Sequence, residues 1–311
     1  MTRAPIKVHF RRFYPRFDPH QFWIPLIEQA SGATTRLSSL TEADLVITSV
    51  FESRREMWKR RMESRLGGPV LPAPPIRTRS TAKSIWVSGE NIRPPVEGYD
   101  LTFSFDLDPF GSRNLYLPLI LTELDWFYQL RTEEARDFNP RSGMTRMRPG
   151  ELVVRRETET RNRSKFACAF VGNAEPVRMR AIAALQRVGQ IDVFGAAVGR
   201  PLASKADVAS DYRFMLCFEN DLYPGYVTEK PLEAYQCGCI PLWRGIDAGN
   251  LMNPLSLVDE YEFATLEDFV DRVAALDSSE TEQQVMLSQP FFREQPTLDA
   301  VIHSLRRLVC S

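Results

Sequence analysis

Apolar residues recur along this chain with two alternating periods, and the alternation predicts strands and helices in turn. Near the N-terminus, Ile6, Val8 and Phe10 occupy every second position, which is the period of a strand with one buried face. The next apolar segment, FWIPLIEQA at 22–30, has the spacing of a helix. Three apolar runs downstream are typical of buried strands: ADLVITSVF (43–51), SIWVSGEN (84–91) and YDLTFSF (99–105).

A second series of the same kind begins at residue 166. Its predicted strands are FACAFVGN (166–173), IDVFG (191–195), RFMLCF (213–218) and CIPLW (239–243). The first helix of this series opens with Pro176 and closes with Gly189, residues that favour the start and the end of a helix. Further helices are predicted at 228–237, at 265–277, where Thr265 and Asp268 have capping-box spacing, and at 297–310.

The segment between the two series, residues 131–165, is charged and has little apolar periodicity. We expect it to join two domains and to be partly ordered at best. Strand–helix alternation in two blocks predicts two doubly wound α/β domains, whose ligands bind at the carboxyl ends of the strands. The predicted domains are 1–160 and 161–295, with the last helix (296–311) able to pack back on the first domain.

Composition narrows the class of protein. The chain has 311 residues, 43% of them hydrophobic and 25% charged, which is typical of a soluble globular protein with two domains. A net charge of -1 argues against a nucleic-acid-binding surface, so no nucleic-acid partner is expected. Since neither a membrane span nor a signal-peptide core is present, the predicted location is the cytoplasm.

The cysteines predict reduced thiols. Five is an odd number, and three of the five lie in apolar strand-like runs, as buried thiols of cytoplasmic proteins do. Cys237 and Cys239 have no second cysteine pair or nearby histidine that would complete a zinc site. No metal site is therefore expected there.

The densest group of polar residues follows the predicted strand 213–218, in the sequence CFENDLYPGYVTEK (217–230). Glu219 and Asn220 come at the carboxyl end of this strand, and a Tyr-Pro-Gly turn follows. Thr228 is predicted to cap a helix that places Glu229 and Lys230 in its first turn.

These side chains suit a nucleotide sugar. Lys230, the Tyr226 hydroxyl and a helix N-terminus would bind a diphosphate, while Glu229 and Asn220 would bind sugar hydroxyls. The alternative is an ordinary helix start, in which Glu229 stabilises the helix dipole, Lys230 is solvated and Tyr226 is part of the packing. Spacing alone leaves both readings open.

The same stretch closely resembles the signature of the α-1,3/4-fucosyltransferases, glycosyltransferase family 10. The matching residues are FEN (218–220) and YVTEK (226–230), followed by AYQCGCIPLWRG (234–245). A second segment, WVSGENIRP (86–94), is similar to the Gly-Glu-Asn segment of the family, and FVGNAEPVRMRAIAAL (170–185) matches more loosely. The membrane anchor of animal members has no counterpart, so a soluble bacterial type is expected.

The resemblance implies a GT-B fold, in which two Rossmann-like doubly wound domains face each other across a cleft. The N-terminal domain would bind the acceptor and the C-terminal domain the nucleotide sugar. It implies transfer of L-fucose from GDP-β-L-fucose, with inversion, to a glycan hydroxyl, expected to be O3 of GlcNAc or Glc on a bacterial surface glycan or its lipid-linked precursor.

The resemblance also implies roles for individual residues. Glu90 corresponds to the general base, and its pKa is expected to be raised by partial burial. The implied donor-binding residues are Arg178, Asn220, Tyr226, Glu229 and Lys230. Because two of these are cations that could stabilise the leaving diphosphate, neither a metal nor another cofactor is expected. From the residues alone, Glu90 could instead cap the turn after its strand.

Other interpretations stay open. The chain could be a transferase of the same fold with another nucleotide sugar, or a non-catalytic protein that binds a nucleotide or a glycan. Asp106-Leu107-Asp108 has the form of the Asp-X-Asp metal motif of other glycosyltransferases, but its place after a matched strand favours a structural role or a place in the acceptor wall. The basic segment 54–65 is typical of a solvated helix face, and the alternative is contact with an anionic acceptor or, peripherally, with the inner membrane.

Overall fold

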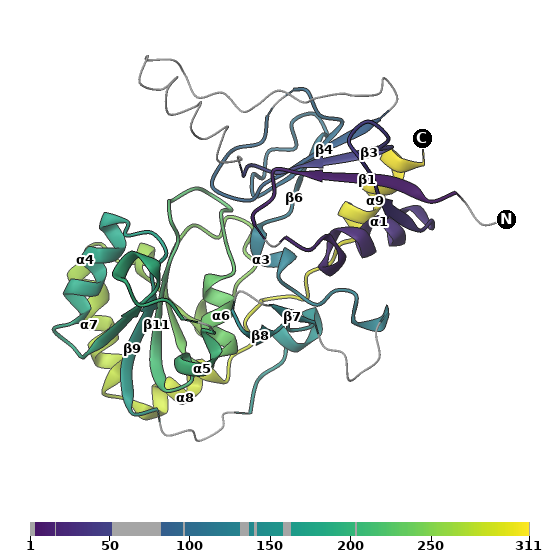
Figure 1. Ribbon diagram of the computed structural model, residues 1–311. Helices are drawn as coiled ribbons and strands as arrows, with labels where there is room; N and C mark the ends of the chain where they lie inside the picture. Colours follow the sequence, from purple (N-terminus) through teal and green to yellow (C-terminus); the bar gives the residue numbers. More distant parts are fainter. Residues whose placement is uncertain are drawn as a thin grey trace, which may run out of the picture. The chain divides into compact units, whose positions relative to one another are not determined.

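The computed structural model describes residues 4–15, 17–51, 82–95, 97–130, 137–139, 142–157, 163–202 and 204–310. The chain forms two compact units. One comprises Met1–Leu119 together with Thr297–Ser311, and the other comprises Ile120–Pro296. Each unit is built on a parallel β-sheet (Figure 1).

In the first unit, the described strands form a parallel sheet in the order β2-β1-β3-β4-β5-β6. The strands are β1 (Ile6–Arg11), β2 (Thr35–Leu37), β3 (Leu45–Thr48), β4 (Lys83–Val87), β5 (Leu101–Ser104) and β6 (Asn114–Tyr116). The 3-10 helix η1 (Pro19–Gln21) and helix α1 (Trp23–Ser31) connect β1 to β2. Every strand and helix that the sequence predicted within the described residues of this unit is therefore confirmed, while β2 and β6 were not predicted.

The C-terminal helix α9 (Asp299–Val309) belongs to the first unit, although it follows the second in the chain. Its buried residues Val301 and Leu305 face the unit, and Arg306 Nε donates to the Ala30 carbonyl of α1 at 2.9 Å. Figure 1 shows α9 beside α1. The return of the chain places its last helix on the unit with which the chain begins.

The second unit contains a parallel sheet in the order β10-β9-β11-β12-β13. The strands are β9 (Lys165–Phe170), β10 (Ile191–Phe194), β11 (Tyr212–Phe218), β12 (Ile240–Arg244) and β13 (Val258–Asp259). The helices are α4 (Pro176–Leu185), α5 (Ala206–Ala209), α6 (Lys230–Gln236), α7 (Leu266–Asp277) and α8 (Glu280–Leu287), with 3-10 helices at Ala196–Val198 (η4), Pro254–Ser256 (η5) and Glu260–Glu262 (η6). In Figure 1, α4 and α7 cover one face of the sheet and α5 and α6 the other, as in a doubly wound fold.

Burial on both faces explains why these strands are apolar without a break. Phe214, Leu216 and Phe218 alternate with Met215 and Cys217 along β11, and all of them are buried. A parallel sheet with helices on both faces requires this pattern, since neither face meets water. The predicted strands and helices of this unit are confirmed, and so is the capping box of α7, in which Thr265 Oγ1 accepts from the Asp268 N–H at 3.1 Å.

The described parts of the charged segment 131–165 contain regular elements. These are β7 (Phe138–Asn139), β8 (Met144–Thr145) and η3 (Pro149–Leu152), which follow α3 (Leu119–Thr122) and η2 (Tyr128–Leu130) in the chain. Arg146 is 5% exposed and contacts the Thr122 carbonyl at 2.7 Å, Glu123 at 3.1 Å and Asp137 at 3.4 Å. Residues 120–157 therefore belong to the second unit, and the boundary lies at 119 instead of 160. The sequence did not indicate this, because a segment that is held by buried, paired charges shows no apolar periodicity.

Two of the sequence expectations concern membranes. Among the helices that the structure describes, none combines the length and apolarity needed to cross a bilayer. The basic segment 54–65 lies outside the described residues.

Candidate functional site

The sheet of the second unit changes direction between β9 and β11. After β9 the chain moves outward to β10, and it then returns to the other side of β9 to form β11. Doubly wound sheets bind their ligands outside the carboxyl ends of the strands at such a switch point. The segments that follow these two strands, 171–175 and 219–229, contain or adjoin the predicted donor-binding residues.

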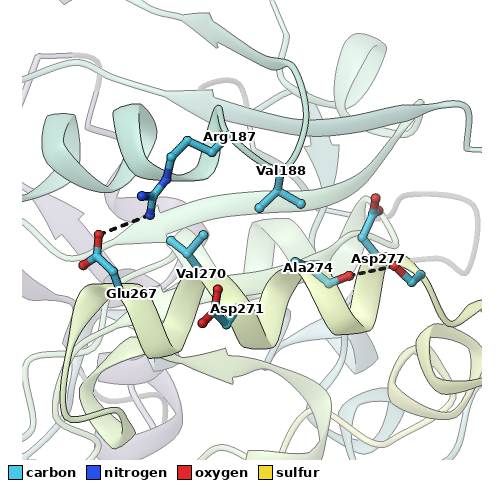
Figure 2. A pocket seen from close by; sticks show the side chains of 8 residues that line it. Arg187, Val188, Glu267, Val270, Asp271, Ala274 and Asp277 are labelled. Carbon is cyan, nitrogen blue, oxygen red and sulfur yellow. Dashed lines mark hydrogen bonds and ion pairs between the residues drawn. The ribbon is translucent and has the colours of Figure 1, made fainter.

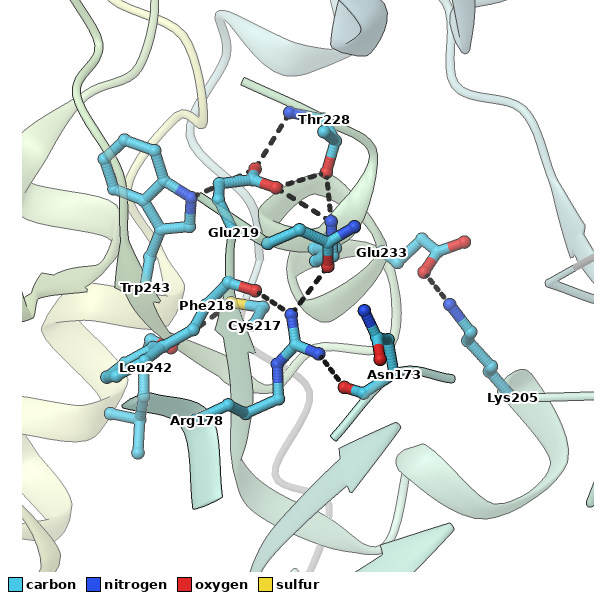
Figure 3. Close-up of polar contacts among 12 residues, drawn as sticks. Asn173, Arg178, Lys205, Cys217, Phe218, Glu219, Thr228, Glu233, Leu242 and Trp243 are labelled. Carbon is cyan, nitrogen blue, oxygen red and sulfur yellow. Dashed lines mark hydrogen bonds and ion pairs between the residues drawn. The ribbon is translucent and has the colours of Figure 1, made fainter. Parts of the chain in front are cut away.

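Arg178 connects these two segments from the first turn of α4. Its side chain is buried, with the residue 4% exposed, and its guanidinium donates to Asn173 O (2.8 Å), Phe218 O (2.8 Å) and Asn220 Oδ1 (2.9 Å), as Figure 3 shows. Burial lowers the pKa of Arg178, and nearby Glu219 opposes this effect, but arginine stays charged at neutral pH. All three hydrogen-bonded acceptors are neutral. The switch point therefore holds a buried cation with no carboxylate bonded to it within the described residues.

Glu219, the first residue after β11, is the centre of a second network. Its side chain is fully buried (0% exposed). Thr228 donates its N–H to Oε1 (2.9 Å) and its hydroxyl to Oε2 (2.7 Å), while Lys230 Nζ donates to Oε2 (2.8 Å) and Trp243 Nε1 to Oε1 (3.4 Å) (Figure 3). The sequence reasoning assigned Glu219 no role, although a carboxylate directly after a buried strand was a visible signal.

This network corrects the predicted start of α6. The helix begins at Lys230 with Glu229 as its N-cap, and Thr228 is not the cap. The hydroxyl of Thr228 donates to Glu219, a partner that lies nine residues earlier in the chain, and so it is not used on the helix. Tertiary contact thus outweighs the local capping preference.

Lys230 is held in place by the same two residues. Its Nζ donates to Glu219 Oε2 (2.8 Å) and Thr228 Oγ1 (2.9 Å), and its side chain is 20% exposed. Burial is the largest effect on the pKa of Lys230 and lowers it, but the charges of Glu219 and Glu229 and the hydrogen bond to Glu219 together raise it above its ordinary value. The positive charge of Lys230, which we predicted to bind a diphosphate, is thus already paired with the carboxylate of Glu219.

The remaining predicted donor residues surround these two networks. Asn220 is exposed and accepts from Arg178 through its side-chain oxygen. Tyr226 is buried and lies close enough to affect the pKa of Arg178. Glu229 is half-buried at the start of α6. The structure therefore gathers all five predicted donor residues around the carboxyl end of β11.

In the first unit, Glu90 lies in the segment after β4 and is half-buried. Its carbonyl accepts from Ser88 Oγ at 3.0 Å and from the Ile92 N–H at 2.6 Å, so the turn around it is closed by hydrogen bonds. Gly89 packs against Phe51, and a Cβ at Gly89 would lie 2.6 Å from the ring, which leaves room only for glycine. Glu90 thus stands on a tightly packed turn at the carboxyl end of a strand.

Aromatic side chains gather near this turn, at the carboxyl ends of β1 and β3, where the first sheet has its own switch point. The rings of Phe13 and Phe17 stack at 3.8 Å, and Tyr14 meets Phe17 and Phe51 edge-on, at 5.7 Å in each case. All four residues are partly buried. The sequence reasoning treated this region as the end of a strand and missed the cluster, which only the meeting of two loops creates.

The Asp-X-Asp sequence is used within the protein. Asp106 Oδ2 accepts from Arg93 Nη2 at 2.6 Å, Asp106 Oδ1 accepts from the Asp108 N–H at 3.1 Å, and Asp108 Oδ1 accepts from the Phe110 N–H at 2.9 Å. Both carboxylates therefore organise the turn after β5. Within the described residues, no group of three or more His, Cys, Asp or Glu side chains is placed to hold a metal ion.

A hollow in the described surface lies away from the switch point. It has a volume of about 500 Å³ and lies between α7 and the residues after α4 (Figure 2). Arg187 and Glu267 form an exposed ion pair across it at 3.2 Å. Its lining residues belong to α7 and to the segment after α4, and none follows the carboxyl end of a strand, so we do not take it as the functional site.

One turn beyond Lys230, Glu233 of α6 is buried beside Lys205, with 2.5 Å between Oε2 and Nζ (Figure 3). Burial raises the pKa of Glu233 to about 7, and Lys205 only partly opposes this effect. The folded protein therefore binds a proton more tightly than the unfolded chain, and the resulting stability is present below pH 4.5 and lost as the pH rises to 7.

A stability measurement tests this shift. Relative to a Glu233→Gln variant, the wild-type free energy of unfolding is expected to fall by about 2 kcal/mol between pH 5 and pH 7.5, since one pKa unit corresponds to about 1.4 kcal/mol. Urea unfolding of both proteins at the two pH values measures the difference. An identical pH dependence in the two proteins would show that Glu233 titrates normally.

Comparison with known proteins adds to this geometry. Residues 160–288 match the family described as glycosyltransferase family 10 (fucosyltransferase), C-terminal part. The chain is 26% identical over 266 residues to an α-(1,3)-fucosyltransferase, FucT, of Helicobacter pylori, covering 78% of this chain and 53% of that protein. It is 32% identical over 114 residues to α-(1,3)-fucosyltransferase C of Drosophila melanogaster, covering 34% of this chain and 27% of that protein.

A solved structure of an α1,3-fucosyltransferase with GDP-fucose is similar to 98% of this chain and 90% of its own, with a TM-score of 0.68 and 20% identity. This likeness confirms the fold, GT-B, with two Rossmann-like domains. The chain spans about half the length of the Helicobacter pylori relative and about a quarter of the Drosophila one (53% and 27%).

Proposed function

We propose that the chain, which matches glycosyltransferase family 10, the fucosyltransferases, over residues 160–288, transfers L-fucose from GDP-β-L-fucose to a hydroxyl of a glycan. The observation that carries the proposal is the buried guanidinium of Arg178 at a switch point, whose hydrogen-bond partners among the described residues are all neutral. A nucleotide diphosphate would supply the missing negative charge at the place where doubly wound domains bind nucleotides.

We assign donor binding to the second unit. Arg178 and Lys230 would face the diphosphate, because both are cations held in fixed positions by hydrogen bonds. Glu229, with its carboxylate, and Asn220, with its amide, would bind hydroxyls of ribose or fucose. Tyr226 would add a hydroxyl donor.

In the proposed reaction, an acceptor oxygen attacks C1 of fucose while the bond from C1 to the diphosphate oxygen breaks. Attack from the face opposite the leaving group inverts the anomeric centre, so the β-linked donor gives an α-fucoside. The carboxylate of Glu90 takes the proton of the acceptor hydroxyl, and GDP leaves with both bonding electrons. The cations of the second unit stabilise the negative charge that develops on GDP.

The proposal includes independence from metal ions, because Arg178 and Lys230 supply the positive charge that a divalent ion provides in other transferases. It assigns acceptor binding to the first unit, where Glu90 lies close to an aromatic cluster. The proposed acceptor hydroxyl is O3 of GlcNAc or Glc, in a surface glycan or its lipid-linked precursor at the inner membrane, met from the cytoplasmic side.

Turnover with chelator present tests the proposal. GDP release from GDP-fucose is expected in EDTA, and only with an acceptor from a panel of galactose- and N-acetylglucosamine-containing sugars. GDP is also expected to stabilise the fold, by about 2.7 kcal/mol at a concentration one hundred times its Kd, in a melting assay where UDP and ADP serve as controls. Stabilisation by UDP or ADP instead of GDP would favour the rival transferase with another nucleotide sugar. Binding of GDP without turnover on any acceptor would favour a non-catalytic protein.

A further inference from the structure

The carboxylate of Glu219 is fully occupied by hydrogen bonds from neighbouring protein groups. A buried carboxylate is costly unless it is paired and hydrogen-bonded, and Glu219 satisfies this with four donors. Oε1 accepts from Thr228 N and Trp243 Nε1, and Oε2 from Thr228 Oγ1 and Lys230 Nζ. A carboxylate has about four acceptor positions, so this one has none left for a ligand hydroxyl.

The ammonium of Lys230, in contrast, keeps one hydrogen-bond donor available for a ligand. It has three N–H donors, of which Glu219 Oε2 and Thr228 Oγ1 take two. Within the part of the chain that the structure describes, the third N–H has no protein partner, and the side chain is 20% exposed. Two fixed hydrogen bonds determine the direction of the third donor, so the ammonium is oriented before any ligand arrives.

We propose that Glu219 is a positioning residue, which holds the Lys230 ammonium and directs its third N–H to a phosphoryl oxygen of the bound nucleotide. The inference rests on the proposed donor site and adds to it the residue that prepares the lysine. Trp243 of β12 and Thr228 hold the carboxylate itself, so strands β11 and β12 both contribute to the orientation of one ammonium.

The pKa of Lys230 supports this role. Burial alone lowers the pKa of this ammonium, and Glu219 contributes both a charge and a hydrogen bond that raise it. In a Glu219→Gln variant the burial remains but the compensation is lost, so the pKa of Lys230 falls. The amide of glutamine also replaces one of the two acceptor oxygens by a donor NH₂, so the four donors that surround Glu219 can no longer all be accepted and the hold on Lys230 is weakened.

The test is the affinity for GDP, measured by calorimetry between pH 7.0 and 8.5. Glu219→Gln is expected to raise the Kd for GDP about tenfold at pH 7.0, the loss expected for a hydrogen bond to a charged group. The ratio of variant Kd to wild-type Kd is expected to be larger at pH 8.5 than at pH 7.0, since the lower pKa of Lys230 in the variant makes it lose its proton at a lower pH than in the wild type. A ratio that stays constant with pH would overturn the inference.

A double-variant cycle separates positioning from simpler roles. In a Lys230→Met background, adding Glu219→Gln is expected not to weaken GDP binding further, because the residue through which Glu219 acts is gone. A purely structural Glu219 would weaken binding in both backgrounds. A Glu219 that merely cancels positive charge would instead strengthen binding when removed, in both backgrounds. Either result overturns the inference.

Glu267→Gln is the matched control, since it removes the carboxylate of the exposed pair with Arg187 and should leave the Kd for GDP unchanged (Figure 2). If Glu219→Gln does not fold, competitive acetylation of the wild type gives the answer. Lys230 is expected to react slowly, because its ammonium is held by Glu219 and Thr228, and to be protected by GDP. Rapid labelling of Lys230 that GDP does not slow would refute the role.

The outcomes also distinguish this inference from the proposed function. Wild-type protein that does not bind GDP would remove the donor assignment and the positioning role with it. Wild-type protein that binds GDP, with a cycle that fails, would remove the positioning role alone.

Discussion

Replacing Glu90 by glutamine is expected to lower kcat for fucosyl transfer by about 10²–10⁴-fold, the usual contribution of a positioned general base. Glutamine has nearly the same shape but cannot take the proton of the acceptor hydroxyl. The Kd for GDP is expected to stay within about twofold, since Glu90 belongs to the first unit and the donor residues to the second. Single-turnover rates with saturating GDP-fucose, together with calorimetric titration of GDP, measure the two effects.

The pH profile adds a second test of the same residue. The acidic limb of kcat/KM, where the base becomes protonated, is expected in the wild type and absent from Glu90→Gln. Glu97→Gln is the matched control, because Glu97 lies in the same connection between β4 and β5 and is exposed. Unchanged turnover in Glu90→Gln would remove Glu90 from the mechanism and leave it as a residue that closes its turn.

Replacing Arg178 by methionine is expected to raise the Kd for GDP about a hundredfold or more and to destabilise the fold. The loss of affinity follows because truncating one side of a buried charged contact costs about 2–5 kcal/mol. The loss of stability follows because Phe218 O, which is buried, would lose its donor, with a cost of about 1–3 kcal/mol for a buried unsatisfied group. Calorimetry and urea unfolding measure the two quantities on the same samples.

Arg180→Met is the control for this variant, since Arg180 lies on the same helix two residues further on and is exposed. Arg178→Lys is expected to fall between the two, because lysine retains the charge but not the fork of donors that reaches both segments. Lower stability with unchanged GDP affinity would show that Arg178 only connects the strand ends and does not bind the donor.

Local patterns were enough to predict most of the elements. The apolar runs of β3, β4, β9 and β11 indicated buried strands, because a parallel sheet covered on both faces leaves no polar alternation. The start of α7 could be predicted as well, since a capping box involves two residues that are only three positions apart in the sequence. Short elements such as β2, β6 and β13 escaped prediction, because two or three residues do not establish a period.

Residues whose partners lie far away in the chain could not be assigned in this way. The charged segment around Arg146 was interpreted as a linker, but Glu123 and Asp137 pair with this arginine and make its burial possible. Thr228 has the residue type of an N-cap, and its hydroxyl is used by Glu219 instead. In each case the sequence gives the type of the residue, but the role of the residue depends on a partner that comes close only in the folded protein.

The sequence by itself determined the two α/β blocks, the resemblance to a family and the composition of the candidate site, because periodicity and a contiguous motif are local properties of the chain. Only the tertiary structure decided how the charges of that motif are distributed. Lys230 is paired with the buried Glu219, whereas Arg178, from a different motif, is bonded to neutral acceptors at the same strand end. The physical reason is that the state of a buried charged side chain depends on the groups within hydrogen-bond distance of it. The order of the strands in the sheet, and not the order of residues in the sequence, determines which groups these are.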